Sequence, residues 1–394
     1  MNKLPNGWQI KTLGDIFLIE RGSSPRPIKS FLTNDNNGIN WIKIGDAKNN
    51  SKYIYQSAEK IRPEGKKYSR FVEIGDLILS NSMSFGRPYI MKTIGCIHDG
   101  WVVLRKILKN IIYEEYAYYI LSSNQVHSEF SKLAAGSVVK NLSIDRIKQV
   151  YIPIPPLDEQ KRIASALSKI DAYLENTIKL IEEKERFKRG IAKKLLTCKE
   201  GENIPEARFK GFEDEWEETQ ILEFVNNNII KIEKGKSITK SKIEEGDIPV
   251  IAGGKTPPYY HNKYNYNFPC ITISASGSAG YVWFHDYKIW ASDCHVIYTD
   301  NKRYNIKFLY HYLKNIQDLI YYLQVGGVQK HVYAKDLIKL NIPNITIEEQ
   351  EKIGGYLSLL DEEIDNLKKQ KELIKEMKRG AMQKLLSGEV RLLE

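Results

Sequence analysis

The chain has 394 residues, with 59 Lys and Arg against 49 Asp and Glu, so its formal net charge is +10. This length allows two or three domains that each bury a core, and the basic balance points to a polyanionic partner. The four cysteines are scattered without paired spacing, which argues against a disulfide scaffold or a zinc site. The start, MNKLPNGWQI, lacks an apolar signal core, and no apolar run reaches membrane-spanning length, so we expect a soluble, cytoplasmic protein.

The first globular segment is expected over residues 1–155. Short apolar stretches at 41–44, 76–79 and 101–104 are interrupted by Gly, Pro, Asn and Ser, which is typical of strands joined by turns. A stretch rich in Tyr, Ala and Leu then predicts one helix from about 113 to 133, ended by Gly136. We therefore predict a compact domain of mixed α and β structure.

A long helix is predicted next, over residues 156–200. Apolar residues recur at spacings of three and four and form a narrow stripe that resembles a coiled-coil seam. Asp158 is placed to cap the start of the helix, and Gly201 lies near its end. The residues of the stripe that we expect to form a helix pair are Ile163, Leu167, Ile170 and Leu174.

This helix occurs twice in the chain. Residues 152–196 and 342–386 align without a gap at an offset of 190, and chance does not keep such a register. The second copy predicts a helix over 346–394, with a capping box at Thr346-x-x-Glu349 and a stop near Gly388. Its expected helix-pair residues are Ile353, Leu357, Leu360 and Ile364.

Each helix also contains an internal glycine, Gly190 in the first and Gly380 in the second. A glycine inside a helix costs about 1 kcal/mol relative to alanine. Two interpretations remain open at this point. The glycine is either a tolerated weak position, or it allows close approach of the other helix or of a partner protein.

The globular pattern also restarts, over residues 201–345. Ile248, Val250 and Gly254 match Ile39, Trp41 and Gly45 at an offset of 209, and Gly326, Val328 and Lys330 match Gly136, Val138 and Lys140 at 190. The falling offset indicates that loops were shortened while strands and helices were kept. The predicted fold is therefore α+β, with two mixed domains alternating with two long helices. If these helices pair as an antiparallel coiled coil, the repeat gives an internal pseudo-two-fold arrangement.

The layout resembles one known family. The I-P-x-x-x-x-x-E-Q sequence before each long helix, the K-R-G and K-L-L sequences near its end, and the stretches G-S-V-V-K-N-L-S and G-G-V-Q-K-H-V-Y resemble the DNA specificity subunits of type I restriction-modification systems. The resemblance covers nearly the whole chain. It implies two target-recognition domains that each read half of a gapped double-stranded DNA sequence. It also implies that the helices dock two methyltransferase subunits, with restriction subunits added for cleavage.

Catalysis by this chain itself is not expected. Gly235-Lys236-Ser237 and Gly254-Lys255-Thr256 lack the first glycine of a phosphate loop, which is Ile230 or Pro249 here. The stretch 256–259, T-P-P-Y, resembles a methyltransferase motif but carries threonine where an amide or carboxyl acceptor is needed. The E-x-K at 64–66 has no second acidic ligand at a persuasive spacing, and the histidines form no ligand pattern. No metal or cofactor is expected in this chain, and the complex is expected to use S-adenosylmethionine, ATP and magnesium.

Candidate DNA-binding residues lie in basic or hydroxyl-rich loops of both globular segments. Arg, Lys, Asn and Gln can bond to base edges, whereas Lys and Ser more often hold phosphates. Residues that differ between the copies, such as Asn141 and His331 or Arg87 and Tyr281, are better candidates for reading bases than the shared Lys140 and Lys330. The full set of candidates is Arg21, Arg26, Lys29, Ser82, Ser84, Arg87, Lys140, Asn141, Lys234, Lys236, Lys255, Tyr259, Ser276, Ser278, Gln329, Lys330 and His331.

Two alternatives remain beside the type I specificity subunit. One is a specificity subunit of a methyltransferase-only or other restriction system. The other is a coiled-coil interaction scaffold whose basic charge is incidental. Salt-dependent DNA binding would separate the scaffold from both specificity subunits, because phosphate contacts release counterions.

Overall fold

The computed structural model describes residues 4–48, 51–81, 86–108, 110–134 and 143–393. The chain forms two compact units. Unit 1 contains Met1–Asn176 and Lys371–Glu394, and unit 2 contains Thr177–Gln370. Both are mixed α and β structures, as predicted. Their boundaries differ from the predicted domains 1–155, 156–200, 201–345 and 346–394, because each unit combines one globular domain with the first part of its own long helix and the last part of the other.

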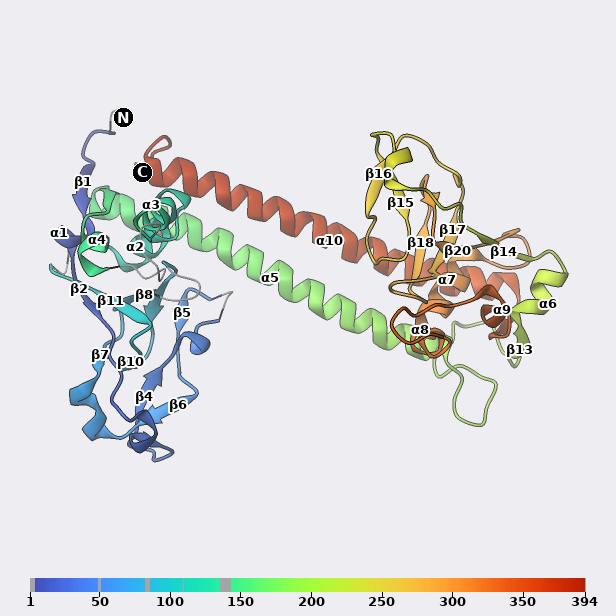
Figure 1. Ribbon diagram of the computed structural model, residues 1–394, viewed down its shortest axis with the longest axis horizontal. Helices are drawn as coiled ribbons and strands as arrows, with labels where there is room; N and C mark the ends of the chain where they lie inside the picture. Colours follow the sequence, from blue (N-terminus) through green and yellow to red (C-terminus); the bar gives the residue numbers. More distant parts are fainter. Residues whose placement is uncertain (1–3, 49–50, 82–85, 109, 135–142, 394) are drawn as a thin grey trace. The chain divides into compact units, whose positions relative to one another are not determined.

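Unit 1 contains the strands drawn in blue to cyan in Figure 1. They are β1 (Gln9–Thr12), β2 (Phe17–Arg21), β3 (Leu32–Thr33), β4 (Ile39–Ile42), β5 (Tyr53–Ile54), β6 (Glu59–Ile61), β7 (Arg70–Val72), β8 (Leu77–Ser80), β9 (Pro88–Met91), β10 (Gly95–Ile97), β11 (Trp101–Lys106) and β12 (Tyr151–Ile154). The helices are α1 (Leu13–Ile16), α2 (Glu114–Leu121), α3 (Asn124–Ala134), α4 (Ile144–Lys148) and the start of α5 (Leu157–Leu196), with single 3-10 turns at Ile28–Ser30, Ile44–Asp46 and Pro63–Tyr68.

Unit 2 repeats this order of elements. Its strands are β13 (Glu217–Gln220), β14 (Ile230–Lys234), β15 (Ile248–Ile251), β16 (Tyr259–His261), β17 (Cys270–Ser274), β18 (Val282–His285), β19 (Trp290–Ala291), β20 (Cys294–Thr299) and β21 (Asn341–Asn344). Its helices are α6 (Ile221–Asn226), a 3-10 turn at Lys240–Lys242, α7 (Ile306–Asn315), α8 (Gln317–Tyr322), α9 (Ala334–Leu337) and the start of α10 (Ile347–Ser387).

The two halves of the sequence repeat fold into sheets with the same strand order. Strands β2-β11-β8-β9 of unit 1 have the same order as β14-β20-β17-β18 of unit 2, and β6-β4-β10 have the same order as β16-β15-β19. The parallel pairing of β4 with β10 recurs between β15 and β19. Unit 1 has β3, β5 and β7 in addition. The strands that both units share are therefore the framework, and the first domain extends it at the sheet edges.

The predicted helix over 113–133 is wrong in one respect, because the structure has two helices there. The break falls at Ser122 and Ser123. The Ser122 hydroxyl donates to the Tyr118 carbonyl at 2.7 Å, and the Ser123 hydroxyl accepts from the Val126 amide at 3.3 Å. Serine side chains compete with the backbone for such hydrogen bonds, so they favour helix ends over helix interiors. Gly136, the expected terminator, lies outside the described residues.

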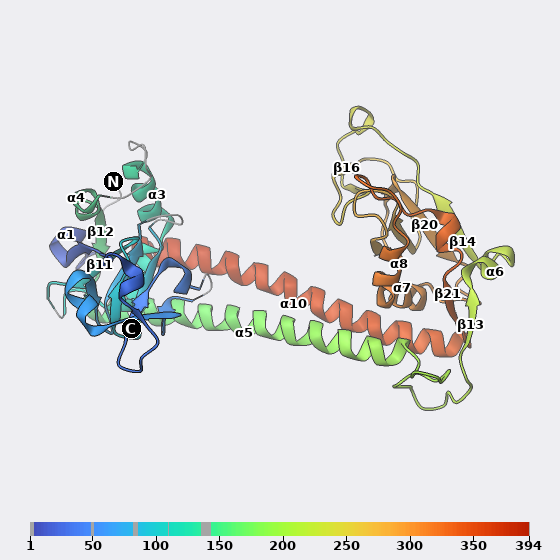
Figure 2. The same cartoon turned by 60° about the horizontal axis from the view of Figure 1, so that its bottom comes forward.

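The long helices α5 and α10 are each unbroken, as Figures 1 and 2 show in green and red. They contain 40 and 41 residues. Inside unit 2 they run antiparallel, since Lys188 pairs with Asp361 whereas Glu185 pairs with Lys368, further along α10. Inside unit 1 they run antiparallel as well, since Asp171 pairs with Lys378 whereas Arg162, earlier in α5, donates to the carbonyl of Leu392, just beyond the end of α10.

The helix-pair residues predicted from the seam divide into two groups. Ile163 and Leu167 are fully buried in the core of unit 1, where Leu385 and Leu386 from the end of α10 join them. Ile353 and Leu357 occupy the same place in unit 2, with Leu195 and Leu196 from α5. Ile170 and Leu360 pack at the margins of these cores, Ile364 is buried, and Leu174 is half-buried. The K-L-L ends of the helices therefore complete the cores of the domains.

The internal glycines do not bring the two helices close together. A Cβ atom built on Gly190 or on Gly380 would have no neighbour within 4 Å. The interpretation of close packing between the helices is therefore wrong for both positions. A weak position or the approach of a partner protein remains as the explanation.

Candidate nucleic-acid interface

Polar loops of the second domain gather at one edge of its sheets. Strands β14 and β17 end there and β20 begins there, because Lys234 pairs with His295 and Ser274 pairs with Cys294. The loop after β15 joins them, since the Ser292 amide donates to the Ile251 carbonyl at 2.7 Å. Most of the candidate DNA-binding residues of the second domain follow these strand ends.

The loops at this edge are fixed to one another through their backbones. The Ser278 amide donates to the Gly253 carbonyl at 2.6 Å. Gly277 has φ +64°, and a Cβ there would lie 2.7 Å from the Gly253 carbonyl oxygen, so both the conformation and the close approach favour glycine. The Ser276 hydroxyl donates to the Asp293 carboxylate, which ties this turn to the start of β20. Ser276 and Ser278 therefore help to shape the edge.

Basic and amide side chains stand on this framework. Lys234, Lys236, Lys255, Tyr259, Gln329 and Lys330 are exposed, and His331 is half-buried against Tyr333, with ring centroids 6.3 Å apart. A cavity of about 370 Å³ opens between Lys255, Ser278, Tyr321 and Gln324. The edge thus presents donors for phosphates and for base edges around a shallow hollow.

One lysine of this region was not found from the sequence. The Lys314 ammonium lies 4.2 Å from the centre of the Tyr281 ring, whose centre lies 5.6 Å from the Lys255 ammonium. Burial, together with the nearby Lys188 and Lys255, lowers the pKa of Lys314 to about 8. In the sequence Lys314 is an ordinary helical lysine of α7, so nothing distinguished it from a solvated surface residue.

The corresponding edge of the first domain is organised around Asp99, which matches Asp293 at an offset of 194. Arg21 Nε donates to the Asp99 carbonyl at 3.2 Å, and the Ser24 hydroxyl donates to its carboxylate at 3.1 Å. The exposed Arg26 guanidinium lies 3.6 Å from the same carboxylate. The structure therefore brings Arg21 and Arg26 together.

The remaining candidates of the first domain are placed less centrally. Lys29 is exposed in the 3-10 turn Ile28–Ser30. Arg87 is half-buried, with its guanidinium 5.4 Å from the centre of the Tyr89 ring. Ser82, Ser84, Lys140 and Asn141 lie outside the described residues.

A basic hollow beside Arg21 was missed by the sequence analysis. It is a cavity of about 810 Å³ lined by the 3-10 turn Pro63–Tyr68, by β7 and by Arg105. Arg70 Nε donates to the Arg21 carbonyl at 3.4 Å, which places the hollow next to the Asp99 edge. Lys66 and Lys67 stand over the Phe71 and Tyr68 rings at 3.7 and 4.8 Å. In the sequence Lys66 was visible only as the end of the E-x-K stretch at 64–66, and Lys67 only as the residue after it.

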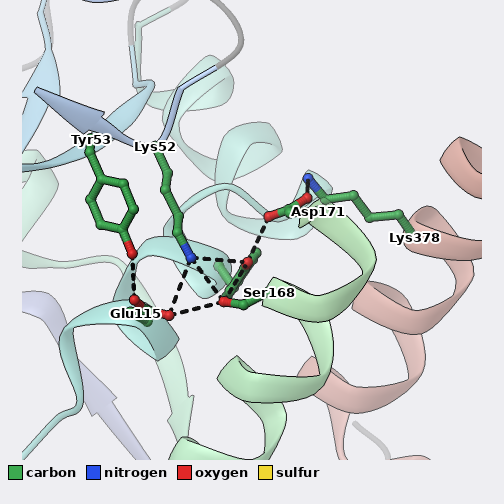
Figure 3. Close-up of polar contacts among 7 residues, drawn as sticks. Lys52, Tyr53, Glu115, Ser168, Asp171 and Lys378 are labelled. Atoms are coloured by element: carbon green, nitrogen blue, oxygen red, sulfur yellow. Dashed lines mark hydrogen bonds and ion pairs between the residues drawn. The ribbon is translucent and has the colours of Figure 1, made fainter. Parts of the chain in front are cut away.

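Where the first domain meets the two long helices, polar side chains form a network (Figure 3). The Lys52 ammonium lies 3.2 Å from the Glu115 carboxylate and donates to the Ser168 hydroxyl at 2.8 Å. Burial alone would raise the pKa of Glu115, but hydrogen bonds from Tyr53, Lys52 and Ser168 together with the Lys52 charge hold it below its usual value.

The same network reaches the helix pair. The Tyr119 hydroxyl donates to the Asp171 carboxylate at 2.6 Å, and that carboxylate pairs with Lys378 of α10. In unit 2 the matching pair is Asp361 and Lys188, each at an offset of 190 from its counterpart. His311 there replaces Tyr119 and lies 3.1 Å from the Ser358 hydroxyl.

The glutamate of each E-Q pair anchors the domain to its helix. Glu159 is 1% exposed and accepts from Trp8 Nε1 at 3.0 Å and from Arg391 at 2.7 and 2.8 Å. Glu349 is 2% exposed and accepts from Trp216 at 3.4 Å and from Arg208 at 2.7 and 2.8 Å. The predicted capping box is therefore only half formed. The Glu349 amide donates to the Thr346 hydroxyl, but the Glu349 side chain is used by Arg208 and Trp216.

The glutamine of each E-Q pair holds the next domain helix. Gln160 Oε1 accepts from the Tyr113 amide at 2.8 Å, and Gln350 Oε1 accepts from the Asn305 amide at 2.8 Å. Tyr113 and Asn305 are the residues before α2 and α7. Asp158, in contrast, lies inside the first turn of α5 and pairs with Lys161. The prediction that Asp158 caps the helix is wrong, because the helix already includes Leu157.

Within the described ranges, no group of three or more His, Cys, Asp or Glu side chains is arranged to hold a metal ion. Among those same residues, no helix is both long and apolar enough to cross a membrane. The T-P-P-Y stretch ends the connection between β15 and β16, and its Tyr259 is the first residue of β16.

Comparison with curated proteins identifies relatives along the whole chain. The putative type I restriction enzyme MjaX specificity subunit of Methanocaldococcus jannaschii is 28% identical over 421 residues, which cover 100% of this chain and 96% of that protein. The putative type I specificity subunit S.MgeORF438P of Mycoplasma genitalium is 26% identical over 362 residues, which cover 85% of this chain and 91% of that protein.

Solved structures share the fold. A crystal structure of a type I restriction-modification S subunit from M. genitalium matches with a TM-score of 0.65 at 20% identity, and it covers 98% of both chains. The sequence model for the type I restriction modification DNA specificity domain matches residues 5–183 and 213–376. These two matches cover most of the chain, one in each half. The chain therefore belongs to the family of type I restriction-modification DNA specificity subunits.

Proposed function

We propose that this chain reads a gapped, two-part sequence in double-stranded DNA, one part with each globular domain. The observation that carries the proposal is that the two domains share their strands and loop positions but differ in the side chains that those loops expose. Both domains place loops at the same strand ends, around Asp99 and Asp293, but the exposed side chains on those loops differ. A shared framework with different donors suits two half-sites of different sequence.

The first edge offers guanidinium groups. Arg21 and Arg26 can donate two hydrogen bonds each to guanine, and Lys66 and Lys67 supply charge for the neighbouring phosphates. The second edge offers Gln329, which suits adenine, with Lys255 and Lys330 beside it for phosphates. The net charge of +10 is consistent with this partner.

We further propose that the helix pair docks two methyltransferase subunits and that restriction subunits join the complex. The supporting observation is that a Cβ built on Gly190, which is exposed, or on Gly380, which is half-buried, would have no neighbour within 4 Å, so both positions leave room for a partner. The chain itself is proposed to be non-catalytic. S-adenosylmethionine, ATP and magnesium would be used by the other subunits, and the length of α5 and α10 would set the gap between half-sites.

Methylome sequencing tests this function. Cells that carry the gene together with its methyltransferase gene are compared with cells from which this gene alone is deleted. We expect a gapped two-part methylated motif that disappears on deletion. Unchanged methylation, with the methyltransferase shown to be expressed, would contradict the proposal and favour the scaffold.

The two domains can then be assigned to the two half-sites. Gln329→Ala is expected to relax or remove recognition of the half-site read by the second domain, while the other half of the motif stays the same. Arg26→Ala is the matched change in the first domain. An equal loss at both half-sites from either variant would contradict separate reading.

A further inference from the structure

The loop between α8 and α9 carries an apolar residue at its tip. Val328 has a relative exposure of 109%, so its side chain contacts nothing in the chain. Four more apolar or aromatic residues nearby in the sequence are exposed as well, namely Leu319 and Tyr322 of α8 and Val325 and Tyr333 of the loop. Exposed apolar residues that gather beside polar groups mark interaction sites.

The exposure of Val328 is not a result of a loose loop. Val325 and His331 exchange two backbone hydrogen bonds of 2.9 and 2.8 Å and close a tight hairpin. Gly326 has φ +114°, and a Cβ there would lie 2.4 Å from the Gln329 carbonyl oxygen, so the turn requires glycine. The hairpin therefore holds Val328 in one place.

The base of the hairpin is attached to the candidate nucleic-acid interface. The Val332 amide donates to the Ala275 carbonyl at 3.0 Å, directly after β17. His295 Nε2, from β20, donates to the Val332 carbonyl at 2.9 Å. The valine thus stands on the edge where Lys236, Lys255 and Lys330 are exposed.

The sequence repeat adds an independent observation. Val328 matches Val138 at the offset of 190, although neighbouring positions differ, with Val139 against Gln329 and Asn141 against His331. Val138 itself lies outside the described residues. Burial does not require an apolar residue at position 328, so the match to a valine in the other copy indicates a contact that does not depend on the sequence of the half-site.

DNA fits this contact better than a protein partner. The tip is flanked by Gln329 and Lys330, whose amide and ammonium groups suit bases and phosphates. Base faces and deoxyribose rings are apolar and do not depend on sequence. Apolar side chains that enter a groove can press between base steps and unstack them.

We propose that Val328 is an apolar wedge that presses on the bases of the second half-site irrespective of their sequence. This inference rests on the proposed function. The wedge distorts the duplex locally, and the neighbouring amide and cationic groups then read and hold the distorted site.

The test uses the full chain assembled with its methyltransferase subunits and a duplex that contains the methylated motif. Val328→Ala shortens the wedge, and Val328→Thr keeps its shape but replaces one methyl group with a hydroxyl. Both are expected to weaken binding about tenfold, for the target and for a duplex with a scrambled second half-site alike. 2-Aminopurine placed in the second half-site should brighten on binding of the wild type, and this increase should fall in both variants.

Leu222→Ala is the matched control, because Leu222 is an exposed apolar residue that lies away from the interface. It belongs to α6, which precedes the first residue of β14, whereas the candidate interface lies at the last residue of that strand. It should bind as the wild type does. Wild-type affinity and 2-aminopurine signal in the Val328 variants would overturn the proposal, as would a loss confined to the intact target. Weaker assembly with the methyltransferase, with unchanged DNA affinity of the chain alone, would instead assign Val328 to a protein contact.

The wedge and the proposed function fail in different ways. If the wild-type complex does not distinguish target from scrambled DNA, the proposed function is wrong. If it does, and the valine variants match it, only the wedge is wrong.

Discussion

The two junctions between a domain and the long helices use one plan with different residues. In unit 1, Tyr119 lies six positions after the helix-capping Tyr113 and bonds to Asp171 and Ser168. In unit 2, His311 lies six positions after Asn305 and faces Asp361 and Ser358. The position of the side chain is kept, but the tyrosine hydroxyl of unit 1 is replaced in unit 2 by an imidazole, a group that can be protonated in acid. The repeat therefore preserves contacts more strictly than it preserves chemistry.

The glutamate anchors give the largest expected effect. Arg391→Ala leaves Glu159 buried without its cation, and Arg208→Ala does the same to Glu349. We expect Arg208→Ala to lower the free energy of unfolding of unit 2 by about 3 to 5 kcal/mol, and Arg391→Ala to lower that of unit 1, because each leaves a buried carboxylate unpaired. Urea denaturation, with limited proteolysis to show which unit opens, measures this. Arg189→Ala, at an exposed position of α5, is the control and should change little.

An equal loss of stability in both units in either variant would contradict the pairing of one arginine with one unit.

The dependence of stability on acid pH tests the same ion pair in unit 1. Burial would raise the pKa of Glu159, but Arg391 and Trp8 hold it below its usual value. The stabilisation that Glu159 provides is therefore present above about pH 4.5 and is lost as the pH falls through the lowered pKa.

The histidine junction predicts a difference at milder pH. Burial, with Lys188 and Lys307 nearby, lowers the pKa of His311 to about 3. The unfolded chain takes up this proton near pH 6.5 and the folded chain does not, so unit 2 loses stability as the pH falls below about 6.5. His311→Gln, which cannot be protonated, should reduce that loss by about 1 to 2 kcal/mol at about pH 5.

Urea denaturation of wild type and variant at about pH 7 and about pH 5 checks this prediction. Some loss should persist in the variant, because burial also lowers the pKa of His285 in unit 2 to about 3. Tyr119→Phe in unit 1 is the control and should not change the dependence on pH in this range. The same pH dependence in His311→Gln and wild type would show that the proton is taken up elsewhere.

The helix glycines give the smallest effect. Gly380→Ala meets open space, so we expect a gain of about 1 kcal/mol in the stability of unit 1 from helix propensity. Gly354→Ala is the contrasting variant, because its Cβ would lie 2.6 Å from the Phe308 amide nitrogen. It should destabilise unit 2. Thermal unfolding separates them, and a loss of stability in Gly380→Ala would indicate a packed position.

Much of the fold was predictable because its signals are local and repeated. The apolar spacing predicted both long helices, and the match of Gly326 to Gly136 showed that the domains repeat. The strand-end loops around Ser276 and Lys255 followed from the same matching. These features depend on neighbours in the sequence, which is where periodicity and turn residues carry information.

Contacts between distant residues were not predictable. Arg391 lies 232 positions from Glu159, and no local pattern connects them. The sequence predicted a capping role for Glu349, whereas Arg208 and Trp216 bond to its carboxylate. Lys66 and Lys67 were hidden in an ordinary charged stretch, since only the fold places them beside Arg21.

The attachment of Glu159 to Arg391 also bears on how the chain folds during synthesis. Domains generally fold as they emerge from the ribosome, the N-terminal one first. Unit 2 is complete once Gln370 has emerged, but unit 1 needs Lys371–Glu394. Its buried carboxylate therefore waits for Arg391, which is made after the whole of unit 2. The unit that is translated first is thus completed after unit 2, and until the end of α10 has emerged it exposes the surface that this segment later covers.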